Sequence, residues 1–599
     1  MKRTWHRLCA IQFILFAVSI QTVRPQSAVP EVAILSNQVV YNSSGPKLAV
    51  LKSSTPLPEG LEIQLKEAKH SQTVFTTRSG KAEEVSGWEK GIWYSRGDFS
   101  GFSGEGEFQL EIQYRGSVSR SHVFRIERNG LACVALPAIV SFFHHQRADS
   151  KEELEADKKV LLFGSTRTVD LRGGWCDASG DVSKYFSHLA YTNFMLPQQI
   201  PMVTWAMVNT AERIPSLLEQ TGTKDALATE AVYGADYIMR SLSPEGYFYM
   251  TVFSYFNPDP GARRVVGLLA DSKTTSDYQC AYREGGGMAI AALARVSGWK
   301  MDGEFSHKQY LAAAERAFAH LQQFSLKYAD DGKDNIIDDY CALMASSELW
   351  MATGKPVYRD EARKRAGNLC GRLSDKGYFI ANDADRPFWH AADAGLPLIA
   401  LARYLDKETD PGLRERALLT IRKSLDYNLV ITQAVTNPFG YPRQSFLFRG
   451  KVQDAFFIPH ENESGWWWQG EDARLGSLAA AVLTGGRLVY PDAGTASGVK
   501  PELEQFAGNL VSWILGCNPY DMCMMYGYGR NNVPYMKSMY GHGSGKGGIS
   551  NGITGKDGMP DGSGIDFKVE DNGNEWRWSE QWIPHTAWFL QAVTAFSTH

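Results

Sequence analysis

Two aspartates stand four residues apart in the stretch GGWCDASGDVSKY, residues 173–185: Asp177 and Asp181. Gly180 lies between them and disfavours a regular helix, so we expect both carboxylates on a loop that leads into a helix. Two neighbouring carboxylates can accept hydrogen bonds from one water molecule, orient it and take its proton. The alternative is structural, because one aspartate could cap the helix that follows while the other is exposed.

A second acidic cluster lies close to the C-terminus, in DNGNEWRWSEQWIPH, where Glu575 and Glu580 alternate with Trp576, Trp578 and Trp582. A carboxylic acid that is desolvated among indole rings has a raised pKa and stays protonated near neutral pH. Such an acid, opposite a carboxylate that activates water, is what inverting hydrolysis of a glycosidic bond requires. Capping or ion pairing of these glutamates is the structural alternative.

Aromatic residues are abundant, with 16 Trp, 26 Tyr and 29 Phe in 599 residues. Trp and Tyr suit sugar binding because a flat ring face can stack on a pyranose while the ring edge forms hydrogen bonds. In IPHENESGWWWQG, residues 458–470, three adjacent Trp cannot all face a core. We therefore predict a substrate-binding role for Trp175, His460, Glu463, Trp466, Trp467, Trp578 and Trp582.

The first residues carry a basic start followed by an apolar run, Leu8–Ile20, which is typical of a signal peptide. We predict that residues 1–28 direct export to a periplasm or to the cell exterior, with no membrane insertion. Residues 29–127 contain short alternating segments separated by turn residues, which predicts a β-sandwich. From residue 128 to residue 599 apolar residues recur at helical spacing, in about a dozen segments joined by long loops. This pattern favours a closed ring of helix pairs with a site where the loops gather.

Composition excludes several functions. The formal net charge of −4 offers no electrostatic basis for binding nucleic acid. The seven cysteines beyond residue 28 are scattered and odd in number, so they form no disulfide framework, and none has zinc-site spacing. The acidic run DDGKDNIIDDY could bind structural calcium, but helix capping by Asp334 or Asn335 explains it better. We predict no metal site and no required cofactor. The sequence allows no prediction of the oligomeric state.

Several of these motifs, in this order, resemble glycoside hydrolase family 9, whose members often carry an immunoglobulin-like domain ahead of an (α/α)6 barrel. ILSNQVVYN followed by KLAVL resembles the opening of that domain, and GGWCDASGDVSKY resembles the family's Gly-Gly-Trp-x-Asp-Ala-Gly-Asp motif. LVSWILGCNPYDMC resembles the stretch ahead of the C-terminal site. The resemblance implies an inverting mechanism with Asp181 as general base, Asp177 holding the same water, and Glu580 as general acid, seven residues before Ala587. Glu575 is the second choice for the acid.

Two departures bear on the substrate. Ser179 widens the aspartate spacing from the family's three residues to four, and His542 stands alone where cellulases of the family have a His-His-Arg cluster. The wider spacing resembles a branch with exo-acting members, including exo-β-glucosaminidases. We therefore predict a hydrolase of β-linked, gluco-configured saccharides that is exo-acting. The alternatives are an endo-β-1,4-glucanase and a non-catalytic carbohydrate-binding protein.

Overall fold

A computed structural model describes residues 32–598 apart from 189–194, 258, 270–271 and 538–540. The predicted signal peptide, residues 1–28, lies outside the described residues and stays a prediction. Within the described ranges, no helix combines the length and the apolar character that a membrane crossing requires.

Residues 32–127 form a β-sandwich, as predicted. One sheet has the order β1-β3-β6, and the other has the order β2-β9-β7-β4-β5 with β8 paired to β7. In β4, Ile63 and Leu65 are buried between the sheets while Glu62 faces solvent, which is the alternation expected of a half-buried strand. The strands are β1 (Val32–Ser36), β2 (Val40–Asn42), β3 (Leu48–Ser53), β4 (Glu62–Glu67), β5 (Thr73–Arg78), β6 (Trp93–Asp98), β7 (Gly106–Tyr114), β8 (Ser117–Arg120) and β9 (Phe124–Glu127).

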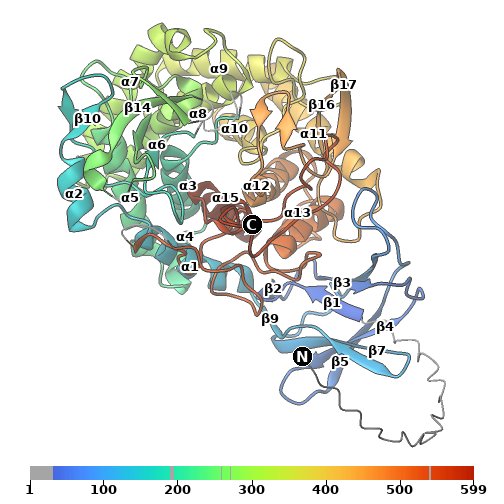
Figure 1. The fold of residues 1–599 in the computed structure, drawn as a ribbon. Coiled ribbons are helices and arrows are strands. Elements are labelled where there is room, and N and C mark those ends of the chain that lie inside the picture. Colours follow the sequence, from blue (N-terminus) through green and yellow to red (C-terminus); the bar gives the residue numbers. More distant parts are fainter. Residues whose placement is uncertain (1–31, 189–194, 258, 270–271, 538–540, 599) are drawn as a thin grey trace, which may run out of the picture.

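The remainder of the chain forms an (α/α)6 barrel, as predicted (Figure 1). Six inner helices make a closed ring, because each contacts the next and the last contacts the first. In ring order they are α3 (Ile200–Arg213), α6 (Gly287–Val296), α8 (Ile336–Thr353), α10 (Leu396–Leu405), α12 (Asp472–Val489) and α15 (Ile583–Ser597). The outer helices are α1 (Gly130–His145), α5 (Lys224–Arg240), α7 (His307–Tyr328), α9 (Pro356–Gly371), α11 (Pro411–Gln433) and α13 (Pro501–Ile514).

Residue patterns explain which helices lie inside. All ten residues of α6 are buried, and a helix that is buried all round must sit within a core. In α7, by contrast, the buried residues recur at helical spacing on one face. They are Tyr310, Ala313, Ala314, Ala317, Phe318, Leu321 and Ser325.

Segments between α1 and α6 along the chain form a six-stranded sheet, in the order β11-β10-β14-β13-β12, with β15 paired to β14. Its strands are β10 (Val160–Leu162), β11 (Thr168–Val169), β12 (Lys184–Tyr185), β13 (Thr251–Phe253), β14 (Arg264–Leu269) and β15 (Lys273–Thr275). The prediction that a helix starts directly after the aspartate pair is therefore wrong. Lys184 and Tyr185 pair with β13, and helix α3 begins only at Ile200.

The sandwich packs tightly on the barrel. Gln38 donates through its side-chain amide to the carbonyl of Asp521, and its Oε1 accepts from the backbone N–H groups of Arg530 and Asn531. The Trp88 ring packs on Trp513 at a centroid distance of 6.0 Å and also on Phe439 and Phe456. The core that surrounds Trp88 is continuous with that of the barrel.

Candidate active site

The aspartate pair lies on a glycine-rich loop that no helix continues. Gly173, Gly174 and Gly180 all have positive φ, at 84°, 76° and 136°, which L-residues with side chains rarely adopt. Asp177 and Asp181 are nearly fully buried, and neither caps a helix. The structure therefore does not support the capping interpretation of this pair.

The loop is fixed by the segment just before the last helix. Ser179 donates its N–H to the carbonyl of Gln581 at 3.1 Å, and its hydroxyl accepts from the Gln581 N–H at 2.8 Å. Beside this pairing, Ile583 donates its N–H to the Asp177 carbonyl at 2.9 Å. Ser179, which widens the aspartate spacing, is thus one of the residues that join the two halves of the site.

All three candidate catalytic carboxyls line one pocket of about 330 Å³. A carboxylate oxygen from each of Asp177 and Asp181 and a ring nitrogen of His188 lie within 4.8 Å of one another. Glu580 approaches from the opposite segment, where its Oε1 lies 3.9 Å from the position that a Cβ would take at Gly180. The complete lining is Asp177, Gly180, Asp181, His188, Phe256, Ser272, Gln469, Met536, Trp576, Glu580 and Trp582.

Hydrogen bonds orient the two aspartates differently. The Trp582 indole donates to Asp177 Oδ1 at 2.8 Å. Asp181 instead accepts from the Ser183 N–H on Oδ1 at 2.8 Å and from the Tyr185 hydroxyl on Oδ2 at 2.9 Å. Burial, reinforced by the charges of Asp181 and Glu580, raises the pKa of Asp177 well above its usual range.

Glu580 is held as a neutral acid. Burial raises its pKa to about 8, and the nearby charge of Asp181 adds to this effect. The side-chain amides of Gln469 and Asn551 approach Oε2, each at 3.4 Å. Glu575 is a poor alternative acid, because backbone N–H groups bind its carboxylate and lower its pKa.

The structure brings only part of the predicted substrate-binding set to the pocket. Of that set, Trp582 lines it, and Trp467 packs behind Trp582 at a centroid distance of 6.0 Å with almost no exposure of its own. Trp466 is 38% exposed and contacts Trp468 edge-on, outside the pocket lining. Glu463 accepts a hydrogen bond from the Trp389 indole at 2.8 Å.

Three further members of that set require correction, because they are buried away from the pocket. Trp175 is fully buried and donates to Glu230 at 3.2 Å. Trp578 is also fully buried and donates to the Thr554 hydroxyl at 3.0 Å. His460 lies 2.6 Å from Asp557 through its Nδ1. Each is a buried side chain of the core whose polar atom is paired with another side chain.

Sequence reasoning missed the pocket-lining residues His188, Phe256, Ser272, Gln469 and Met536. It also missed Tyr185 and Asn551, which are outside the pocket lining and donate to Asp181 and Glu580. Phe256 carried a weak signal, because the aromatic pair Tyr255–Phe256 precedes Asn257 in a turn-like sequence. The structure gives both aromatic residues positive φ, and Phe256 is 57% exposed.

The acidic run at 330–339 forms ion pairs and a helix cap. Asn335 accepts from the Ile337 N–H at the start of α8, which confirms the capping interpretation. Asp338 pairs with Arg283 at 2.8 Å, and Asp339 pairs with Arg365 and Arg372. These arginines form ion pairs with carboxylates that would otherwise be available to a calcium ion. The prediction that no cofactor is required stays a prediction.

Comparison with known proteins identifies the family. Residues 133–580 match the family described as glycosyl hydrolase family 9, and residues 30–117 match the cellulase N-terminal ig-like domain. A xyloglucan-specific endo-β-1,4-glucanase of Bacteroides ovatus is 23% identical over 430 residues, 64% of this chain and 70% of its own. Endoglucanase 4 of Arabidopsis thaliana is 27% identical over 243 residues, 38% of this chain and 46% of its own.

Solved structures agree on the fold. A family 9 structure from Bacteroides ovatus has a TM-score of 0.63 at 18% identity and covers 94% of this chain and 99% of its own. Endoglucanase J30 of family 9 also has a TM-score of 0.63 at 18% identity, covering 93% of this chain and 99% of its own. The chain belongs to glycosyl hydrolase family 9 and is a glycoside hydrolase of this inverting family.

Proposed function

We propose that this protein removes terminal sugar units from β-linked, gluco-configured oligosaccharides, as a β-glucosidase or β-glucosaminidase. The observation that carries this proposal is the small pocket that holds all three carboxyls. Its volume of about 330 Å³ is near the lower end of the ~300–1,000 Å³ range of small-ligand pockets. Phe256, Met536 and Trp576 add bulky walls, which suits a chain end better than the middle of a polymer.

In the proposed mechanism Asp181 is the general base. Between the two aspartates the proton is held on Asp177, because burial and the neighbouring charges raise the pKa of that carboxyl. Asp181, oriented by Ser183 and Tyr185, takes a proton from the water as the water oxygen attacks the anomeric carbon. Asp177 presents its Oδ2 to the same water, because its Oδ1 already accepts from Trp582.

Glu580 is the proposed general acid. With a pKa of about 8 it carries a proton at neutral pH, which it gives to the leaving oxygen as the glycosidic bond breaks. Gln469 and Asn551 approach its Oε2, so Oε1 is left to face the leaving oxygen. Water and glycoside thus yield two sugars, and the anomeric carbon is inverted because attack and departure occur on opposite faces.

An endo-β-1,4-glucanase is the second candidate, favoured by the names of the two curated relatives. Proton NMR of the anomeric signals, on a panel of cello- and chito-oligosaccharides, distinguishes the candidates by product length and sugar. We expect single units with the α-configuration as first products. Viscosity of a soluble β-glucan should fall slowly relative to reducing-sugar release; a rapid fall would contradict exo action and support the endoglucanase.

A further inference from the structure

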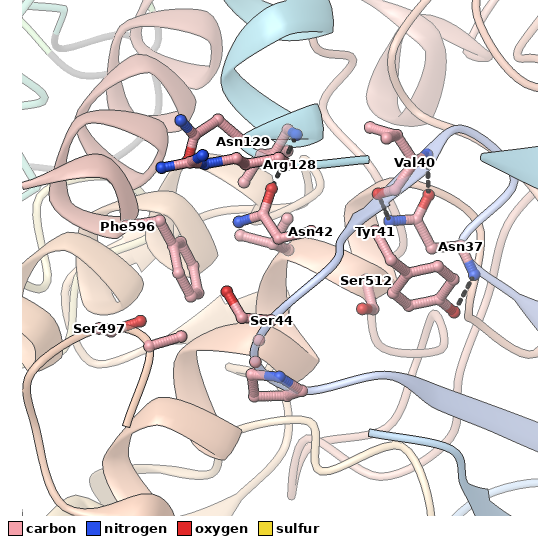
Figure 2. A pocket seen from close by; sticks show the side chains of 16 residues that line it. Asn37, Val40, Tyr41, Asn42, Ser44, Arg128, Asn129, Ser497, Ser512 and Phe596 are labelled. Carbon is pink, nitrogen blue, oxygen red and sulfur yellow. Dashed lines mark hydrogen bonds between the residues drawn. The ribbon is translucent and has the colours of Figure 1, made fainter. Parts of the chain in front are cut away.

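A second pocket, of about 310 Å³, lies where the sandwich meets the barrel (Figure 2). The end of β2 and the turn after it supply Asn42 and Ser44, and the start of α1 supplies Asn129. Ser512 of α13 and Phe596 of α15 complete the wall from the barrel side. This pocket shares no residue with the catalytic pocket.

Several polar groups that line this pocket have no hydrogen-bond partner within the described part of the chain. Ser497 and Ser512 are 2% and 5% exposed, and no hydrogen bond of either hydroxyl is found among the described residues. Asn42 uses its Oδ1 to accept from the Leu131 N–H at 3.0 Å, which leaves its Nδ2 to donate toward the pocket. These three groups keep the capacity to form hydrogen bonds with a polar ligand or with water in the pocket.

The electrostatics favour a neutral ligand. Helix α1 begins at Gly130, beside the pocket, and contributes the partial positive charge of a helix N-terminus. Helix α15 ends at Ser597, next to the lining residue Phe596, and contributes the partial negative charge of a helix C-terminus. The two ends offset each other, and the cationic Arg128, which also lines the pocket, is exposed, so that solvent screens its charge.

We propose that this junction pocket binds one neutral pyranose ring, either a free sugar or the end of a saccharide chain. Hydroxyl and amide groups of Asn42, Ser497 and Ser512 match the alternating hydroxyls of a sugar, while Phe596 offers an apolar ring to its flat face. A volume of about 310 Å³ suits a single ring rather than a long chain. The choice of a gluco-configured sugar rests on the function proposed above, whereas the assignment of the pocket as a sugar site does not depend on that function.

Occupancy of this pocket has a structural consequence. The ligand would contact the sandwich through Asn42 and Ser44 and the barrel through Ser512 and Phe596. A ligand that binds only the assembled interface stabilises that interface by mass action. The junction pocket would therefore couple the presence of sugar to the docking of the two domains.

Hydrogen exchange of the full-length protein tests the proposal. Glucose and glucosamine are the probes for the wild-type protein, cellotetraose is tested with Glu580→Gln so that the chain is not hydrolysed, and sorbitol at equal concentration is the control for an osmolyte effect. We expect slower amide exchange at residues 41–46 and 130–133 with at least one of the sugars and not with sorbitol. Protection with glucose alone identifies a free sugar, and protection with cellotetraose identifies a chain end.

Exchange at residues 177–188 reports the catalytic pocket in the same samples, so failure of one site is distinguished from failure of the other. Protection confined to residues 177–188, or equal protection by sorbitol, would overturn the junction site.

Two variants and a control localise the binding. Ser512→Met fills the junction pocket, and Phe596→Ala removes its aromatic wall; we expect each to weaken sugar binding there at least tenfold by calorimetry. Both should keep kcat/KM on a short chromogenic β-glycoside within twofold of wild type. Trp576→Ala, in the catalytic pocket, should lower activity and leave junction binding unchanged. Unchanged binding in both junction variants would show that the pocket holds only water.

Discussion

At the scale of single residues, Glu580 links catalysis to pH. Its pKa of about 8 keeps the proposed acid protonated at neutrality, so activity should decline as pH rises through about 8. We expect Glu580→Gln to lower kcat on natural oligosaccharides by roughly 10²–10⁴-fold, the usual worth of general acid–base catalysis. The alkaline limb of the pH profile should disappear with it.

A leaving group that needs no proton provides the control. Aryl glycosides with acidic phenols should partly restore the rate of Glu580→Gln, since the phenolate departs unaided. Asp181→Asn should show no such recovery, because its defect lies in activating water. Equal recovery of both variants would contradict the assignment of acid and base.

Burial of Glu580 should also make the stability of the folded protein depend on pH. The carboxyl of Glu580 titrates at about 8 in the folded protein and near 4.5 when unfolded. The folded state therefore holds more protons between these pH values, and stability falls as pH rises from about 4.5 to about 8. Glu580→Gln should raise Tm relative to wild type at pH 8 and little at pH 4. Calorimetric scans at both pH values measure this, and a Tm difference independent of pH would refute it.

Prediction of single residues succeeded where the residue type itself indicates a chemical role, as for the acidic residues. Asp177, Asp181 and Glu580 were identified as candidates from type and spacing, and they share one pocket. Gln469 and Asn551 were missed because an amide gains its role only from the carboxylate that the fold brings beside it. The buried Trp175 and Trp578 show the converse error, in which a sugar-binding residue type fills a core.

At the scale of elements, the pairing of the loop at 177–181 with the segment at 580–583 determines the site. We expect Ser179→Ala to leave the Gln581 N–H without its side-chain acceptor, at a cost of about 1 kcal/mol. Because the same contact aligns the aspartates with Glu580, kcat should fall by about tenfold or more while KM changes little. Steady-state kinetics and denaturant unfolding together measure both effects.

A matched control separates alignment from stability. Ser346 is also fully buried, and its hydroxyl donates to the Ala342 carbonyl inside α8. Ser346→Ala should reduce stability by a similar amount with kcat unchanged. If both variants lowered kcat equally, general destabilisation would be the cause and the alignment role of Ser179 would be lost.

Element prediction was strongest where periodicity is long. Helix α7 has 22 residues, and the spacing of its buried residues from Tyr310 to Ser325 can be recognised in the sequence. Strand β12 has two residues, Lys184 and Tyr185, and exists because β13 pairs with it from 66 to 68 positions away. No local pattern encodes such a strand, and the sequence pattern therefore predicts a helix that begins too early.

At the scale of the whole molecule, the two domains should unfold together. Trp88 of the sandwich is buried against Trp513, Phe439 and Phe456 of the barrel. We expect Trp88→Ala to lower the free energy of unfolding by about 3 kcal/mol or more, the usual cost of truncating a buried Trp. Denaturant unfolding followed by circular dichroism should show the loss, and the single wild-type transition should split into two.

Phe75 provides the comparison, since it packs on Phe102 within the sandwich. Phe75→Ala should at most shift the midpoint of unfolding and should leave the single transition unsplit, because the contact between the domains is kept. A single unsplit transition in Trp88→Ala would contradict the role of Trp88 in joining the domains.

The bonds between Asp177 and the segment at 580–583 have a consequence for the order of synthesis. The two segments of this contact lie about 400 residues apart, and helix α15, which closes the ring, is synthesised after the other five inner helices. A growing chain therefore contains the two aspartates proposed to activate water long before it contains Glu580, the proposed acid. Any chain that ends before residue 583 should therefore have no hydrolase activity. Activity should arise only when the ring of helices closes.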